Sequence, residues 1–377
     1  MFRPARFLKP RRSSLAPASF NLIKLSNSRS SIALAIAVKM FNLMALTKTV
    51  ATMPVSNKNN LMTIMQNLPP ALFLMGPTAS GKSALAVQLA HALNGEIISV
   101  DSALVFKGMD IGTAKPTLAE RQEIPHHLID IIEPSEVFST GQFRNQALAL
   151  MADISQRGKL PILVGGTMLY FNALSNGLAV LPPADPVIRA QLELDLIELG
   201  KEALHQRLAM VDPEAAARIH PNDPQRVQRA LEVYAISGKS LSSFFTAEPA
   251  HTLPYRVIKL IIAPSDRKIL HGVIAERFMR MLEQGFIEEV ETLYQRGDLN
   301  ETLPAIRAVG YRQAWSYLQG DIDKATMIET AIIATRQLAK RQFTWLRKET
   351  DAFCFQTGQA DLLAEVLATL AKMTQER

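Results

Sequence analysis

Residues 76–83 carry the strongest chemical signal in the sequence, the string Gly76-Pro77-Thr78-Ala79-Ser80-Gly81-Lys82-Ser83. It matches the pattern G-x-x-x-x-G-K-[ST], follows a short apolar run and opens a stretch with helical spacing. The glycines allow backbone N–H groups to surround anionic oxygens, and the following helix adds its positive end. Lys82 supplies a positive charge, and the Ser83 hydroxyl is a candidate Mg²⁺ ligand. The loop predicts a site for a ligand with two or three linked phosphates.

Two further polar residues are predicted to reach the same place. Asp101 follows the apolar run Glu96–Val100, and Thr167 follows Pro161–Val164 after two glycines. Since the carboxyl ends of parallel strands share one edge of a sheet, both should lie near the phosphate loop. The run before Thr167 lacks the terminal acid that organises Mg²⁺ and water in NTPases and kinases. This favours a reaction in which diphosphate leaves and a neutral nucleophile loses a proton; Asp101 as a plain Mg²⁺ ligand or helix N-cap is the alternative.

The elements that must position these residues alternate between short apolar runs and helical stretches. The candidates are the strands Ala71–Met75, Glu96–Val100, Pro161–Val164 and Val257–Ile262 and the helix Ser83–Leu93. This alternation predicts an α/β fold, a P-loop NTPase-like parallel sheet core flanked by helices, with a helical insertion domain. We expect five segments: a basic leader (1–66), the first part of the core (67–184), the insertion (185–250), the second part of the core with C-terminal helices (251–350) and a tail helix (351–377).

Composition narrows the class of protein. The chain is 48% hydrophobic and 20% charged, which is typical of a folded protein. Residues 1–60 hold ten basic and no acidic side chains, so the remainder carries 31 basic against 35 acidic groups, a net charge of −4. Any nucleic-acid contact must therefore rest on local clusters. The single cysteine, Cys354, excludes a disulfide scaffold and a cysteine-rich zinc site.

The leader itself has three interpretations. Its apolar stretch Ile32–Val38 is too short to span a membrane. The composition fits an organelle transit peptide and, less well, a secretory signal. The third interpretation is that the true start is Met62 or Met65, just before the first predicted strand.

The sequence resembles a known family in six strings, which are, in order, G-P-T-A-S-G-K-S, V-D-S-A-L-V-F-K-G-M-D-I-G-T-A-K-P, V-G-G-T-M-L-Y, H-P-N-D-P-Q-R-V-Q-R-A-L-E-V-Y, A-V-G-Y-R-Q-A-W and K-R-Q-F-T-W-L-R. The family is the bacterial tRNA dimethylallyltransferases, also called tRNA isopentenyltransferases, and the likeness runs from about Leu72 to Arg347. It implies transfer of a dimethylallyl group from dimethylallyl diphosphate to N6 of the adenine 3′-adjacent to the anticodon, in tRNAs that read U-starting codons.

The resemblance also implies roles for individual residues. Asp101 acts as general base on the adenine amine, Thr167 binds the bridging oxygen, and Lys82 with Mg²⁺ neutralises the departing diphosphate. Ser83 would hold the metal ion. The residues implied to contact tRNA are Asp101, Ser102, Ala103, Leu104, Thr167, Arg189, Gln225, Arg226, Val227, Gln228, Arg229, Arg307, Ala308, Val309, Gly310, Tyr311, Arg312, Lys340, Arg341, Gln342, Phe343, Thr344, Trp345, Leu346 and Arg347.

The residues themselves partly favour these RNA contacts. Gly310-Tyr311 is a turn beside an aromatic ring that is able to stack on a base, and Lys340–Arg347 interleaves basic and aromatic groups. Without the resemblance, such blocks are more often solvated helix faces and core aromatics. Arg277 lies in a predicted helix, Asp266–Gln284, where it either reaches the diphosphate or forms a plain basic face with Arg280, and we leave it outside the catalytic set.

Other functions stay open at this point. An adenylate isopentenyltransferase would use a free nucleotide and has little need of RNA-binding blocks. A small-molecule P-loop kinase would need the missing acid. A non-enzymatic RNA-binding protein would not need Lys82, Ser83, Asp101 and Thr167 together. We therefore expect tRNA (the anticodon stem-loop) and dimethylallyl diphosphate as partners, Mg²⁺ as cofactor, and a cytoplasmic monomer without membrane attachment, with an organellar home left open by the leader.

Overall fold

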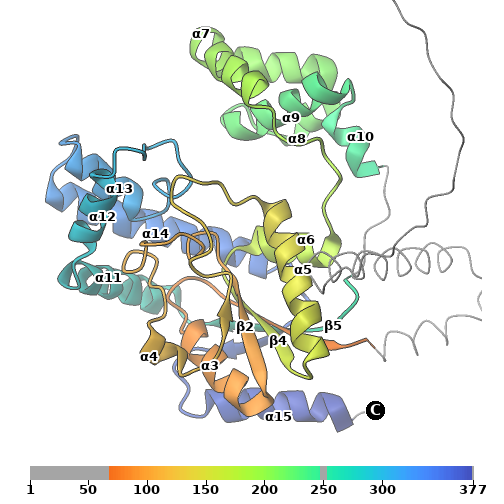
Figure 1. Cartoon of the computed structure of the whole chain (residues 1–377), viewed down its shortest axis with the longest axis vertical. Coiled ribbons are helices and arrows are strands. Elements are labelled where there is room, and N and C mark those ends of the chain that lie inside the picture. Colours follow the sequence, from red (N-terminus) through yellow and green to blue (C-terminus); the bar gives the residue numbers. More distant parts are fainter. Residues whose placement is uncertain (1–67, 247–252, 376–377) are drawn as a thin grey trace, which may run out of the picture. The chain divides into compact units, whose positions relative to one another are not determined.

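The computed structural model describes residues 68–246 and 253–375, and the predicted leader lies outside them. One parallel sheet with the strand order β3-β2-β4-β1-β5-β6 forms the centre of this part of the chain (Figure 1). Its strands are β1 (Pro70–Met75), β2 (Gly95–Val100), β3 (His126–His127), β4 (Leu160–Gly165), β5 (Arg256–Ala263) and β6 (Phe353–Gln356). The predicted parallel α/β core is confirmed.

Strand β1 shows why its sequence is an almost continuous apolar run. Leu72 and Leu74 pack into the apolar core on one face of the sheet, and Phe73 and Met75 pack into the core on the other. Successive side chains of a strand point to opposite faces, so both sets are buried only when helices cover both faces. The apolar run thus encodes a central strand of a three-layer fold.

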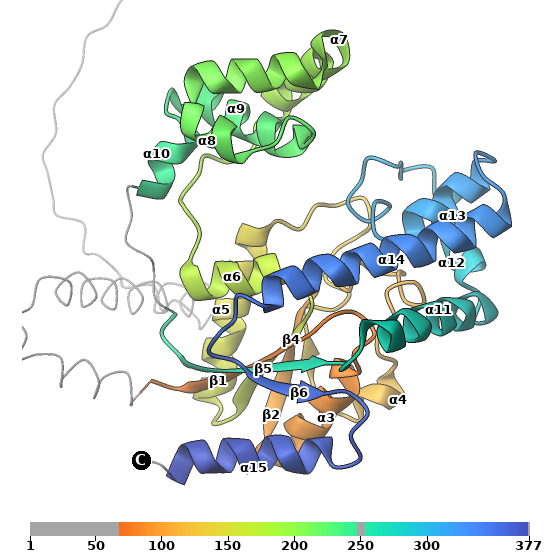
Figure 2. The same cartoon turned by 180° about the vertical axis from the view of Figure 1, so that it is seen from behind.

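Helices cover both faces of this sheet. The core that contains Leu72 also takes side chains from α3 (Lys82–Leu93) and α15 (Leu362–Gln375). The opposite core takes side chains from α5 (Thr140–Gln156), α6 (Met168–Asn176), α11 (Arg267–Glu283), α12 (Phe286–Tyr294), α13 (Tyr311–Leu318) and α14 (Lys324–Leu346). Figure 2 shows α11 to α14 grouped together, and the short helix α4 (Leu118–Arg121) lies in the connection between β2 and β3.

Four helices occupy the range in which the sequence predicted an insertion: α7 (Pro186–Val211), α8 (Pro213–Arg218), α9 (Pro224–Ser237) and α10 (Leu241–Thr246). The first three begin alike, with proline in the first turn and the preceding aspartate accepting hydrogen bonds from backbone N–H groups. These helices bury an apolar cluster of their own, which includes Leu192, Leu204, Leu208, Val227 and Leu231.

The C-terminal segment differs from its prediction as a tail helix. Strand β6 precedes α15 and pairs with β5, so the chain adds an edge strand before the helix begins. Strand β6 has four residues, Phe-Cys-Phe-Gln, of which only Phe355 is buried, and so short an apolar stretch does not by itself predict a strand. None of the helices among the described residues is long and apolar enough to cross a membrane.

A buried carboxylate fixes the start of β2. The Glu96 side chain is 2% exposed and accepts hydrogen bonds from Arg157 Nη2, Lys159 Nζ and His127 Nε2, each at 2.8 Å. The Arg157 hydrogen bonds are the main reason that the pKa of Glu96 lies far below its usual value. Because the folded-state pKa is depressed, this stabilisation is complete above the unfolded-state pKa of about 4.3 and is lost as pH falls below it.

We expect Glu96→Gln to lower the free energy of unfolding at pH 7 by about 2 kcal/mol, since it removes the buried charge that the partly exposed Arg157 and Lys159 side chains bind, and hydrogen bonds to a charged group contribute about this much. The matched control is Glu133→Gln, which breaks an exposed pair with Lys107 and should cost much less. Urea unfolding at pH 7 and pH 3 measures both. The deficit of Glu96→Gln should shrink at pH 3; equal losses for the two variants, or a deficit independent of pH, would contradict the role assigned to Glu96.

Candidate active site

Three adjacent strands end at the same level of the sheet. Met75 of β1 pairs with Gly165 of β4, which in turn pairs with Val100 of β2. The residues that follow are the phosphate loop, the Gly166-Thr167 turn and Asp101. Parallel pairing therefore brings the loop, Thr167 and Asp101 to one edge of the sheet, as the strand order in the sequence predicts.

The backbone of the phosphate loop is shaped for an anion. Ala79 and Gly81 both have positive φ, 62° and 78°, which turns successive N–H groups toward one side. Helix α3 begins at Lys82 without a side-chain cap, so its first N–H groups are free to bind a ligand. A Cβ atom on Gly76 would lie 2.2 Å from the Ile262 carbonyl oxygen, so the close approach of β5 requires glycine here.

Lys82 folds back over this loop. Its Nζ donates a hydrogen bond to the Pro77 carbonyl oxygen at 2.7 Å. Burial lowers the pKa of Lys82 to about 8, the negative charge of Asp101 opposes this shift, and the positive charge of Arg277 adds to it. At neutral pH the ammonium group is therefore still charged but only weakly solvated, which suits it to bind phosphate oxygens.

Asp101 and Thr167 are joined through the backbone that follows β2. The Asp101 Oδ1 accepts hydrogen bonds from Ala103 N at 2.8 Å and Leu104 N at 3.4 Å. Thr167 N donates to Val100 O at 3.2 Å, and Thr167 Oγ1 accepts from Ser102 N at 3.1 Å. Oδ2 of Asp101 has no hydrogen-bond partner in the described part of the chain. This half-buried carboxylate thus caps a turn with one oxygen and keeps the other for a ligand.

Arg277 belongs to the same group of charges. Burial lowers the pKa of Arg277, and the Asp101 carboxylate opposes this effect. Arg277 is half-buried, whereas Arg280, one turn later in α11, is exposed. Of the two arginines, only Arg280 therefore lies on a plain exposed basic face, which was the alternative to a role of Arg277 at the diphosphate. Sequence spacing alone could not distinguish them, because which side of α11 faces Asp101 depends on tertiary packing.

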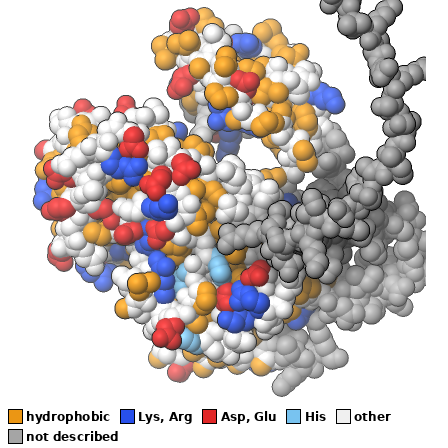
Figure 3. All heavy atoms as spheres, in the orientation of Figure 1, with side chains coloured by type: hydrophobic (Ala, Val, Ile, Leu, Met, Phe, Trp, Pro, Cys, Tyr) orange, Lys and Arg blue, Asp and Glu red, His pale blue; other side chains and the backbone are white. Residues whose placement is uncertain are grey.

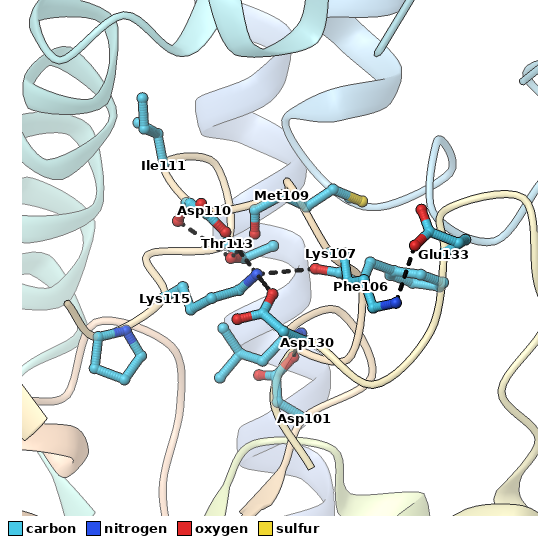
Figure 4. A network of polar contacts seen from close by, with 12 residues as sticks. Asp101, Phe106, Lys107, Met109, Asp110, Ile111, Thr113, Lys115, Asp130 and Glu133 are labelled. Carbon is cyan, nitrogen blue, oxygen red and sulfur yellow. Dashed lines mark hydrogen bonds and ion pairs between the residues drawn. The ribbon is translucent and has the colours of Figure 1, made fainter. Parts of the chain in front are cut away.

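The loop after Asp101 is held by a buried lysine (Figure 4). The Lys115 side chain is 4% exposed, and its Nζ donates to Phe106 O at 2.9 Å, to Asp110 Oδ1 at 2.6 Å and to Asp130. Asp130 N also donates to Leu104 O at 3.1 Å. The string Asp101–Pro116 therefore forms a braced loop rather than a free one, and Asp130 has a structural role in it.

Glu289 of α12 binds the middle of this loop, at residues 110–112. Its carboxylate accepts hydrogen bonds from the backbone N–H groups of residues 110–112 and from the Tyr311 hydroxyl at 2.5 Å. The Tyr311 ring is fully buried and packs edge-to-face against Phe286 at 5.3 Å. Burial and the charge of Glu289 raise the pKa of Tyr311. The prediction that Tyr311 stacks on a base is therefore wrong: the ring is part of the core.

Burial separates the other predicted RNA contacts into two sets. Exposed members are Ser102, Arg189, Gln225, Arg226, Arg307, Arg312, Lys340, Arg341, Thr344, Trp345 and Arg347, and half-buried ones are Ala103, Leu104, Gln228, Arg229, Ala308, Val309 and Phe343. Buried members are Val227, Gly310, Tyr311, Gln342 and Leu346, whose side chains or Cα atoms do not reach the surface. The side chains of these buried members pack beneath the surface, and contact of the blocks with RNA stays a prediction that their exposed members would carry.

Most exposed basic groups on the face drawn in Figure 3 lie among acidic ones. In the insertion, buried Glu232 accepts hydrogen bonds from Arg189 Nε at 2.8 Å and Arg229 Nη1 at 2.5 Å. These two arginines are therefore engaged within the insertion. Arg226 is different, because its side chain is 73% exposed and its ion pair with Asp223, at 3.3 Å, is on the surface.

The residues that the structure describes include no cluster of three or more His, Cys, Asp or Glu side chains able to hold a metal ion. Mg²⁺ is commonly bound through one or two protein oxygens together with substrate phosphates. The Ser83 hydroxyl in the first turn of α3, on an exposed residue, fits that type of site. It is the side chain of the phosphate loop that would hold the ion.

The fold and this site define an α/β enzyme of the phosphate-loop class, with a carboxylate and a hydroxyl beside the loop. A model of the IPP transferase family matches residues 104–349. The chain belongs to the IPP transferase family.

Curated bacterial relatives and solved structures agree with this assignment. The tRNA dimethylallyltransferase of Methylococcus capsulatus is 64% identical over 295 residues, which are 78% of this chain and 95% of the relative. That of Thioalkalivibrio sulfidiphilus is 59% identical over 309 residues, 82% of this chain and 97% of the relative.

Among solved structures, the tRNA isopentenylpyrophosphate transferase of Bacillus halodurans is 38% identical with a TM-score of 0.60, and the match covers 82% of this chain and 98% of that one. A eukaryotic dimethylallyltransferase acting on tRNA is 29% identical with a TM-score of 0.70, and the match covers 82% and 80% of the two chains.

The lowered pKa of Lys82 predicts how binding of inorganic pyrophosphate responds to pH. Affinity should fall severalfold from pH 8 to pH 9, where only about one tenth of the lysine remains protonated in the free enzyme. Isothermal titration of the wild type and of Lys82→Ala measures this, and the variant corrects for titration of the ligand itself. Parallel pH profiles for the two proteins would contradict the assigned pKa.

Proposed function

We propose that this chain transfers a dimethylallyl group from dimethylallyl diphosphate to N6 of the adenine 3′-adjacent to the anticodon in tRNAs that read U-starting codons. The observation that carries the proposal is the shared sheet edge: a phosphate loop, the Thr167 hydroxyl and the Asp101 carboxylate lie beside one another. Relatives at 59% and 64% identity that are named for tRNA favour tRNA over a free nucleotide as the acceptor. A phosphoryl-transfer role is disfavoured because β4 ends at Gly165 and is followed by Gly166 and Thr167, with no acid to organise Mg²⁺ and water.

The exocyclic amine of adenine is a poor nucleophile because its lone pair is delocalised into the ring. In the proposed reaction, N6 forms a bond to C1 of the dimethylallyl group while the bond from C1 to the bridging oxygen breaks. The amine proton passes to the Asp101 carboxylate, and the electron pair of the broken bond stays on the diphosphate. Asp101 is held for this task, since two backbone N–H groups fix Oδ1 and leave Oδ2 available.

Positive and hydrogen-bonding groups around the loop would stabilise the leaving diphosphate. The N–H groups at the start of α3 and the Lys82 ammonium bind its oxygens, and Thr167 donates to the bridging oxygen as negative charge develops there. Arg277 adds a second positive charge, because it lies in the electrostatic neighbourhood of Lys82 and Asp101. When bound at Ser83, Mg²⁺ neutralises part of the diphosphate charge.

The acceptor adenine has to leave the anticodon stack to approach Asp101, because this carboxylate and Thr167 are half-buried. Extruding a base costs a few kcal/mol, which contacts elsewhere along the RNA must supply. Exposed arginines such as Arg226 of α9 and Arg347 at the end of α14 are suited to bind phosphates of the anticodon stem-loop. Trp345, which has Lys348 over its ring at 5.3 Å, offers an aromatic surface beside them.

The test of this function is a transfer assay with labelled dimethylallyl diphosphate, Mg²⁺ and unmodified tRNA, with AMP offered in a parallel tube. We expect label in tRNA and a loss of at least about 10²-fold in Asp101→Ala, the lower range for removal of a general base. Asp321→Ala, which removes an exposed carboxylate, is the matched control and should transfer normally. Label in AMP alone would assign the free-nucleotide activity instead. Normal turnover by Asp101→Ala would exclude this residue as the base.

Phosphate contacts predict a salt effect. Arg226→Ala and Arg347→Ala should each weaken tRNA binding and lower the slope of log affinity against log salt concentration by about 1. Arg296→Ala removes an arginine that is paired with Asp298 and Glu133, and should leave the slope unchanged. Filter binding across a salt series measures all three. An unchanged slope for Arg226→Ala or Arg347→Ala would remove that residue from the interface.

A further inference from the structure

One glutamine connects two parts of the active site that are far apart in sequence. Gln342 lies near the end of α14 and is 8% exposed. Its Oε1 accepts a hydrogen bond from Thr78 N at 2.8 Å, and its Nε2 donates one to Gly166 O at 3.0 Å. The carbonyl oxygen of the side-chain amide therefore binds the phosphate loop, and its NH₂ group binds the turn that carries Thr167.

Two further features support the contacts of Gln342, one at Gly166 and one at the phosphate loop. A Cβ atom on Gly166 would lie 2.3 Å from Gln342 Nε2, so the absence of a side chain at residue 166 makes room for the amide. On the other side, Phe343 and Ala339 of α14 pack in one apolar cluster with Ala79 of the phosphate loop. Helix α14 therefore holds the loop by a hydrogen bond and by apolar contact.

Few side chains could replace this amide. A glutamate would accept from Thr78 N but would face the Gly166 carbonyl oxygen with a second acceptor. A methionine of similar length would leave both backbone groups without a partner, and an asparagine is one methylene shorter. Since Thr78 N is already engaged, the N–H groups that remain for an anion are those that follow Thr78 in the loop.

We propose that Gln342 is a positioning residue, which sets the distance between the phosphate loop and the Gly166-Thr167 turn and does not contact tRNA. With this spacing, the loop and the Thr167 hydroxyl act on the same diphosphate, the loop on its terminal oxygens and Thr167 on its bridging oxygen. The catalytic consequence rests on the proposed function, whereas the effect on pyrophosphate binding does not. Arg341 and Lys340 on the outer side of α14 remain the candidates for RNA contact.

The test compares Gln342→Met with Gln337→Met, a matched change at an exposed position of the same helix. For Gln342→Met we expect kcat to fall by about 10- to 100-fold, the loss that a small misplacement of reacting groups produces. Affinity for inorganic pyrophosphate should fall severalfold, and the Kd for tRNA should change by less than twofold. Gln337→Met should match the wild type in all three measurements.

A second variant separates positioning from a general loss of stability. Gln342→Glu keeps the acceptor for Thr78 N, but it loses the bond to Gly166 O and adds a negative charge beside the phosphate loop, so both pyrophosphate affinity and kcat should fall in a protein that stays folded. Circular dichroism at the assay temperature confirms that each variant is folded.

Three results would overturn the proposal: a raised Kd for tRNA with normal pyrophosphate binding, wild-type kcat in Gln342→Met, or a kcat loss that equals the unfolded fraction. Failure of the wild type to prenylate tRNA would refute the proposed function, but the pyrophosphate measurements would still test the role of Gln342.

Discussion

The active site depends on the close lateral pairing of β2, β4 and β1. Neighbouring strands of a sheet lie about 4.8 Å apart, so groups that emerge from adjacent strand ends share one small volume. Here the approach is so tight that a Cβ atom on Gly165 would lie 2.0 Å from the Val100 carbonyl oxygen. The Asp101 carboxylate, the Thr167 hydroxyl and the phosphate loop are therefore brought together by the pairing of the sheet itself.

The phosphate loop is in turn braced from the C-terminal part of the chain. Gln342 of α14 binds Thr78, and Thr357, which follows β6, donates from its hydroxyl to Ser80 O at 3.0 Å. Arg277 of α11 contributes charge to the same place. Groups that are fixed before substrate arrives lose little freedom in the transition state, which is the basis of electrostatic preorganisation. The local motif is thus complete only when residues more than 250 positions away are folded against it.

The sequence indicated the parts of this site that depend on local pattern. The phosphate loop, the four long strands and the positions of Asp101 and Thr167 follow from motif spacing, apolar runs and the rule that parallel strands end at one edge. Burial within helical blocks was beyond this reasoning, because tertiary packing decides that Arg341 is exposed while its neighbour Gln342 in α14 is buried. Tyr311 was misjudged for the same reason, since its partner Glu289 comes from another helix. Strand β6 was missed because it has only four residues.

The helices of the insertion bury an apolar core of their own, and two of their arginines are anchored by Glu232 within the same segment. The packing of these helices is therefore settled within the segment itself. A substitution at an exposed position of α7 or α9 leaves this apolar cluster intact, so the surface of the insertion tolerates change in a way that the closely packed sheet edge does not.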